Sequence, residues 1–90
     1  METFFDSWDA DAHDKFVKWK DRNQRGYVIN RRSPSDAMIH RASCFHLVFD
    51  SDEPVRLTRT MKVCSLDKRE LEAWARENTK AGLRRCRSCM

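Results

Sequence analysis

The chain carries Cys86-Arg87-Ser88-Cys89 and, earlier, His40-Arg41-Ala42-Ser43-Cys44. A C-x-x-C pair can chelate one metal ion from a single turn, and an H-x-x-x-C pair can do the same from a second turn. Together the two pairs supply the nitrogen and sulfur ligands of a closed tetrahedral zinc site. The spacing therefore predicts a structural Zn²⁺ ion, bound by His40, Cys44, Cys86 and Cys89.

The ligand set stays open at this point, because Cys64 and His46 are also available. A site made only of cysteines satisfies the same requirement, with Cys44, Cys64, Cys86 and Cys89 as its ligands. If Cys64 is not a ligand, its position between Val63 and Ser65 predicts a small buried hydrophobe. We interpret His46 and His13 as ordinary surface or hydrogen-bonded histidines.

Length and composition favour a small reduced protein. A chain of 90 residues has room for one domain, spanning 1–90, and a core this modest benefits from a metal staple. No stretch reaches the length of a membrane span, and the acidic segment 1–6 lacks the basic region and apolar run of a secretory signal. We therefore expect a cytoplasmic protein with reduced cysteines and no membrane partner.

The first predicted element is a helix. Apolar residues from Phe5 onward step by three or four positions, which is the period of one helix face. They are Phe5, Trp8, Ala12, Phe16 and Trp19. Acidic residues precede basic ones along this stretch, which complements the helix dipole. The pattern predicts a helix from Phe5 to about Gln24, with Gly26 as its stop.

The remaining elements are expected to form a sheet and a second helix. Residues 27–29 predict a short strand and residues 31–36 a turn. Strands over 45–49 and 55–63, the latter half-buried by its alternation, are expected to form a hairpin around a turn at 50–54. Ser65 is expected to cap a helix from Leu66 to about Lys80, with Gly82 as its stop. The predicted fold is α+β: a zinc-stapled domain with an N-terminal helix, a short antiparallel sheet and a C-terminal helix that leads into the C-x-x-C knuckle.

Both metal turns resemble those of the Ada-type zinc domain of bacterial methylphosphotriester-repair proteins. Residues 40–44 are similar to that family's C-R-P-S-C turn, residues 81–89 to its A-G-F-R-P-C-K-R-C, and Lys62-Val63 to the N-V that opens the strand before its helix. The resemblance covers about residues 38–89 and implies zinc ligation by His40, Cys44, Cys86 and Cys89, with Cys64 outside the site. It leaves a helical extension at about 5–25 unexplained. The chain is also similar to small uncharacterised bacterial proteins with G-[YF]-V-x-N, H-x-x-x-C, K-V-C and a final C-x-x-C.

One difference from the Ada pattern bears on chemistry. In that family the first cysteine of C-x-x-x-C is both a zinc ligand and the thiolate that accepts a methyl group from DNA phosphate. This chain has His40 at that position, and a metal-bound imidazole offers no thiolate. The resemblance therefore implies the fold and the metal without alkyl transfer. The chain has no P-loop and no G-x-G-x-x-G motif, and an enzyme using Cys64 as nucleophile rests on that cysteine alone, so we expect a protein that is not an enzyme.

The favoured function is a zinc-stabilised module that binds DNA or RNA mainly through the phosphate backbone. The resemblance implies a phosphate contact at Arg84, and Arg41, Arg85 and Arg87 would lie on the same knuckles. A formal net charge of +4 is compatible with a polyanionic partner without requiring one. Arginines that only neutralise thiolate charge and face solvent would fit the sequence nearly as well.

The alternative is a protein-interaction or adaptor module. Its working surface would be the aromatic stripe of the first helix, made of Phe4, Phe5, Trp8, Phe16 and Trp19. Any part of this stripe that the zinc unit leaves uncovered would be a binding surface for a partner. The competing explanation is that the stripe is the domain's own core, which is the more common use of an amphipathic helix.

Overall fold

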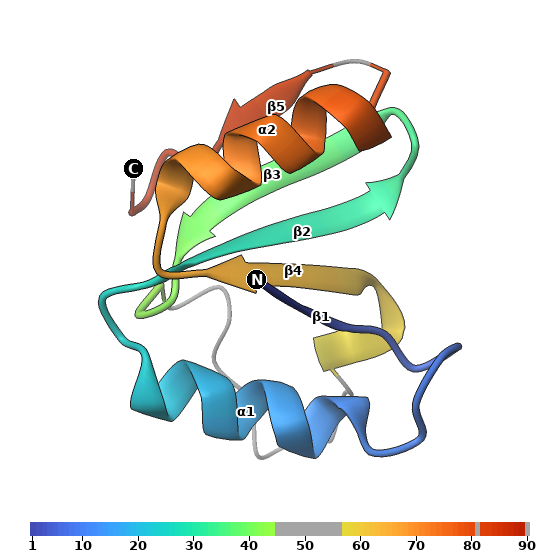
Figure 1. The fold of residues 1–90 in the computed structure, drawn as a ribbon, viewed down its shortest axis with the longest axis vertical. Helices are drawn as coiled ribbons and strands as arrows, with labels where there is room; N and C mark the ends of the chain where they lie inside the picture. Colours follow the sequence, from blue (N-terminus) through green and yellow to red (C-terminus); the bar gives the residue numbers. More distant parts are fainter. Residues whose placement is uncertain (45–56, 81, 90) are drawn as a thin grey trace.

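The computed structural model describes residues 1–44, 57–80 and 82–89. Its strands are β1 (Glu2–Phe4), β2 (Tyr27–Ser33), β3 (Asp36–Arg41), β4 (Met61–Ser65) and β5 (Leu83–Arg85). They form one sheet in the order β1-β4-β2-β3-β5, antiparallel except for the parallel pair β3 and β5 (Figure 1). The helices are α1 (Ala12–Arg22) and α2 (Lys68–Asn78), and a 3-10 turn, η2, spans Leu57–Arg59. The predicted α+β fold is confirmed, although its sheet is mixed.

Each helix packs on its own face of the sheet. Successive side chains of a strand point to opposite faces, so neighbours in β2 serve different clusters. Val28 packs in a cluster with Phe16 of α1. Ile29 packs in the other cluster, with Leu71 of α2. All four of these side chains are 0% exposed, so β2 is covered on both faces and forms the centre of the fold.

The N-terminal helix is shorter than predicted. Residues 2–4 form the edge strand β1, which pairs with β4, and α1 starts only at Ala12. The segment between them turns: the Trp8 amide donates to the Phe5 carbonyl over 3.0 Å. The helical period of Phe5 and Trp8 is a coincidence, because neither residue lies in a helix. The residue before them, Phe4, is buried from the strand β1.

The predicted turn at 31–36 is also shorter in the structure. Strand β2 runs on to Ser33, β3 begins at Asp36, and only residues 34 and 35 turn. The polar composition of residues 31–33 reflects their place at the end of β2, where the burial of the strand falls away.

The predicted strand at 55–63 is only partly correct. Residues 57–59 form η2, and Thr58 anchors that turn to the segment after β1: its hydroxyl donates to Asp6 Oδ1 over 2.5 Å and its carbonyl accepts from the Asp6 amide over 3.0 Å. The strand begins at Met61, and all of its residues are buried, so the prediction of a half-buried strand was wrong. Strand β4 lies between β1 and β2, which explains its burial. The predicted strand at 45–49, the turn at 50–54 and their hairpin lie outside the described residues.

The second helix begins two residues later than predicted and has another cap. Asp67 Oδ1 accepts from the Arg69 amide over 2.9 Å and is the N-cap. Ser65 supports it from outside, because its hydroxyl accepts from the Asp67 amide and donates to Glu70. The helix ends at Asn78, before Gly82, whose φ of +79° instead serves the turn into β5.

Candidate metal centre

The two ligand pairs meet because β3 and β5 are neighbours. His40 lies in β3 and Cys44 in the turn after it, whereas Cys86 and Cys89 follow β5. The parallel register pairs Ile39 with Arg85, and the Cys86 amide donates to the Ile39 carbonyl over 3.0 Å. Both strands therefore deliver their metal turns to the same end of the sheet.

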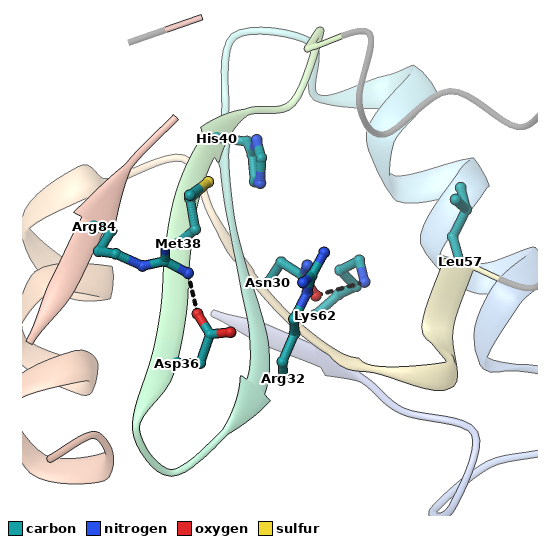
Figure 2. Close-up of a pocket in the computed structure, with 8 residues that line it drawn as sticks. All are labelled: Asn30, Arg32, Asp36, Met38, His40, Leu57, Lys62 and Arg84. Carbon is teal, nitrogen blue, oxygen red and sulfur yellow. Dashed lines mark hydrogen bonds and ion pairs between the residues drawn. The ribbon is translucent and has the colours of Figure 1, made fainter. Parts of the chain in front are cut away.

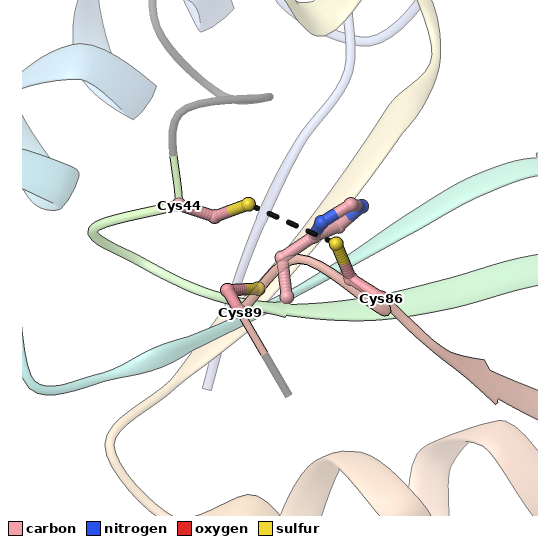
Figure 3. A group of neighbouring side chains, drawn as sticks. Cys44, Cys86 and Cys89 are labelled. Atoms are coloured by element: carbon pink, nitrogen blue, oxygen red, sulfur yellow. Dashed lines mark hydrogen bonds between the residues drawn. The ribbon is translucent and has the colours of Figure 1, made fainter.

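The ligand atoms are close enough to share one metal ion. One ligand atom from each of His40, Cys44, Cys86 and Cys89 lies within 4.8 Å of all the others. Cys44 Sγ and Cys86 Sγ are 3.9 Å apart and point toward one another (Figure 3). Two sulfurs on a tetrahedral zinc, each at about 2.3 Å, are about 3.8 Å apart. A disulfide needs about 2.05 Å, so the spacing matches shared coordination and not a covalent bond.

The centre is closed to solvent on most sides. His40, Cys44 and Cys86 are at most 5% exposed, and Cys89 is half-buried. The Arg41 amide donates to Cys89 Sγ over 3.3 Å, and Arg41 Nε donates to the Cys89 carbonyl over 2.8 Å. A donor to a ligating sulfur fixes the orientation of that sulfur. The donor set suits Zn²⁺, and four protein ligands without an open position are typical of a structural site.

Cys64 is not a member of this group of four, although it packs in the same hydrophobic cluster as Cys44 and Cys86. It sits in β4, is 1% exposed, and packs in the cluster beneath α1. Burial raises the pKa of its thiol well above the usual range, so the group stays protonated at neutral pH. This is the buried small hydrophobe that its position predicts, and a protonated buried thiol makes a poor nucleophile.

The knuckle arginines differ in their surroundings. Arg84 forms an ion pair with Asp36 across β3 and β5, and Arg41 is tied to Cys89 as described. Arg85 and Arg87 flank Cys86 and are exposed. The structure therefore gathers all four at the metal turns, with two of them already engaged inside the chain.

The aromatic stripe is mainly core. Phe4 and Phe16 are buried with ring centroids 5.9 Å apart, and Trp19 packs against the same cluster. Phe5 packs against the other cluster, and its ring meets Trp8 edge-on at 5.6 Å. Trp8 itself is 67% exposed. The surface offered by the stripe is thus centred on one tryptophan.

The predicted role of His13 is confirmed, since its Nδ1 accepts from the Leu57 amide over 2.9 Å and joins α1 to η2. His46 lies outside the described residues.

The sequence did not predict a cavity of about 450 Å³ on the sheet face that carries α1. Its lining residues are Asn30, Arg32, Asp36, Met38, His40, Leu57, Lys62 and Arg84 (Figure 2). The alternation of apolar and polar residues predicts that Lys62 faces solvent. In the structure this residue is only 4% exposed. The sequence signal for a polar cavity was the spacing of Asn30 and Arg32, because residues two apart in a strand share a face of the sheet.

The chain matches no protein-family model, and comparisons with curated proteins and with solved structures likewise gave no match. The resemblance to Ada-type domains therefore stays a prediction that rests on the two metal turns. Within the described residues, no helix is long and apolar enough to cross a membrane.

Proposed function

We propose that the protein binds a structural Zn²⁺ ion through His40, Cys44, Cys86 and Cys89, and that this zinc-stabilised unit binds nucleic acid through phosphate contacts. The observation that carries the zinc assignment is the convergence of these four ligand atoms within 4.8 Å in a largely buried site. Zinc is favoured over harder cations because three of the ligands are sulfurs.

The nucleic-acid role is supported by the arginines at the knuckles. Arg85 and Arg87 are exposed on either side of the ligand Cys86, and the chain has a formal net charge of +4. An arginine held by a rigid metal turn presents a fixed fork of donors to a phosphate at a low entropic cost. Arg84 contributes less in this proposal, because a phosphate must first compete with Asp36 for its guanidinium.

Binding measured across a salt series tests the role. Zinc-loaded protein should bind duplex or single-stranded oligonucleotides in fluorescence anisotropy, with an affinity that falls steeply as salt rises. Arg87→Ala should weaken binding to all sequences and reduce the salt slope by about one. Arg84→Ala should have a smaller effect in the same direction. Arg69→Ala is the matched control, since that side chain is 92% exposed and belongs to α2 and to neither metal turn. Absence of binding at low salt by the zinc-loaded protein would contradict the proposal.

Alkyl transfer is excluded from the proposed function. His40 has no sulfur to activate, and Cys44 and Cys86 are enclosed. Incubation with DNA that bears methylphosphotriesters should leave the intact mass of the protein unchanged. A stable gain of one methyl group on a cysteine would instead assign the protein to the repair reaction.

The second candidate is a protein-interaction module, and the exposed ring of Trp8 is the observation that favours it. An exposed tryptophan is a frequent anchor of protein interfaces. In this case Trp8→Ala would abolish capture of the partner, while Arg87→Ala would leave it unchanged. Loss of capture in Arg87→Ala with retention in Trp8→Ala would contradict the adaptor role.

A further inference from the structure

The cavity lined by Asn30, Arg32, Asp36, Met38, His40, Leu57, Lys62 and Arg84, hereafter the sheet-face cavity, has an uneven charge distribution (Figure 2). At one side Asp36 pairs with Arg84, so these two charges offset each other. At the other side Lys62 and Arg32 both carry positive charge. The cavity therefore has a cationic end.

Lys62 is the buried part of that end. Its Nζ donates to Asn30 Oδ1 over 2.9 Å, to Thr60 Oγ1 over 2.7 Å and to the Thr60 carbonyl over 3.4 Å. All three acceptors are neutral, and within residues 1–44, 57–80 and 82–89 the ion pairs do not include Lys62. Burial has the largest effect on the pKa of Lys62 and lowers it overall, although the nearby Asp6 carboxylate raises it. A buried ammonium group without an ion-pair partner is costly, so an anion at this position would be stabilised.

Arg32 and Asn30 complete the cationic end. They lie two residues apart in β2 and share the sheet face with Lys62. Arg32 is exposed, so its guanidinium can reach a ligand at the mouth of the cavity. Burial is the main cause of the lowered pKa of Lys62, and the nearby charge of Arg32 lowers it further. Asn30 Oδ1 accepts hydrogen bonds from Lys62 and Thr60. The Nδ2 amide of Asn30 is therefore the group that can donate a hydrogen bond to a ligand.

The remaining wall supplies apolar surface from Met38 and Leu57. A cavity of about 450 Å³ falls within the range of small-molecule sites, roughly 300–1,000 Å³. We propose that the sheet-face cavity binds a phosphate monoester, with the phosphate at Lys62, Arg32 and Asn30 and the organic group against Met38 and Leu57. A phosphate dianion matches two cations, and an arginine fork suits its geometry.

The phosphate end of this site uses none of the knuckle arginines, although Arg84 lines the opposite side of the cavity. Its phosphate monoester has two sources, a free small molecule or the terminal phosphate of a nucleic acid strand. The chemistry is the same in both cases, because each presents a dianionic phosphate attached to a single carbon-bound oxygen.

Calorimetric titration of the zinc-loaded full chain with phenyl phosphate tests the site. Wild type should show saturable binding of one equivalent. Arg32→Gln should weaken it at least about tenfold, as expected for loss of one charge-assisted hydrogen bond. Lys62→Met, which removes the charge and keeps an apolar chain of similar length, should weaken it as much or more. Arg69→Gln, an equal change in net charge on α2, should leave the affinity unchanged within about twofold.

Two outcomes overturn the proposal: no saturable binding by folded wild type, or equal weakening in Arg32→Gln and Arg69→Gln. The exposed Arg32 variant keeps the test decisive if Lys62→Met does not fold. Short oligonucleotides with a 5′-phosphate or a 5′-hydroxyl then identify the source. Tighter binding of the phosphorylated strand, lost in Arg32→Gln, supports a nucleic acid terminus; equal binding of both strands alongside phenyl phosphate binding supports a small molecule.

Discussion

His40 is the one residue of the candidate metal centre that is not a cysteine. It is 5% exposed, and it shares the centre with Cys44 and Cys86, which are buried as well. An imidazole and three thiolates hold zinc without leaving a coordination position for a substrate. The residue that departs from the Ada pattern thus fits a structural role for the metal.

Single substitutions should separate ligands from bystanders. His40→Ala, Cys86→Ser and Cys89→Ser should each lose zinc and cooperative unfolding, because the binding free energy of a structural metal is largely folding free energy in small domains. Cys64→Ser should retain the metal, since Cys64 is not one of the four residues whose ligand atoms lie within 4.8 Å of one another. Elemental analysis and thermal unfolding measure both effects. Zinc loss from Cys64→Ser with full retention in His40→Ala would assign the site to four cysteines.

Lys62 should make stability depend on pH in the alkaline range. Burial lowers its pKa from the ordinary 10.5 to about 8, so between these values the unfolded chain binds more protons than the folded one. Stability therefore rises with pH across this window. Relative to Lys62→Met, wild type should gain up to roughly 3 kcal/mol from pH 8 to pH 10.5. Urea unfolding of both proteins gives the difference in their free energies of unfolding at each pH. The pH-dependent effects of zinc binding and of the cysteines are common to both proteins and cancel in this difference. A constant difference would show that Lys62 keeps its proton when folded.

At the scale of the elements, the turn from α2 into β5 controls where the second ligand pair lies. Gly82 adopts a φ of +79°, and a Cβ there would meet no atom within 4 Å. A side chain at position 82 would therefore destabilise the fold through the left-handed backbone conformation and not through contacts with neighbouring atoms.

Gly82→Ala should lower the free energy of unfolding by about 1–2 kcal/mol, the cost of a left-handed conformation for an ordinary residue. Gly82→Asn should cost less, because asparagine tolerates this region better. Denaturant titration of the zinc-loaded wild type and the two variants measures their relative free energies of unfolding. An alanine variant as stable as wild type would show that the turn relaxes freely.

The elements that the sequence predicts best are those whose local pattern and tertiary role agree. The helix around Leu71 and Ala75 and the strand at Val28 and Ile29 are examples, because each buries the side chains that its pattern selects. The edge strand β1 was missed because it is only three residues long and is defined by its pairing with β4, which lies far away in the sequence. Strand β4 was misjudged for a related reason, since its burial on both faces depends on neighbours from distant parts of the chain.

The candidate site divides in the same way. The four candidate ligands are predictable because chelation needs fixed short spacings, and the structure brings all of them together. The sheet-face cavity is not predictable in this way, because Asn30 and Lys62 come together only when β2 and β4 pair. Their shared face follows from strand register, which the chain encodes through long-range packing.

At the scale of the whole molecule, one sheet links the metal centre to the rest of the fold. Strand β2, which precedes both metal turns in the sequence, is inserted between β3 and β4 (Figure 1). The N-terminal segment is therefore integral to the sheet. His40 belongs to the metal centre and also lines the sheet-face cavity, so the zinc ion would stabilise both regions.

X-ray absorption at the zinc edge of the purified, metal-loaded protein reports the ligands of the ion itself. We expect one zinc per chain with three sulfurs at about 2.3 Å and one imidazole nitrogen at about 2.0 Å. His40→Cys is a useful reference, because it should convert the spectrum to four sulfurs. A four-sulfur shell in the wild type, or oxygen ligands from water in place of the nitrogen, would contradict zinc binding by His40, Cys44, Cys86 and Cys89.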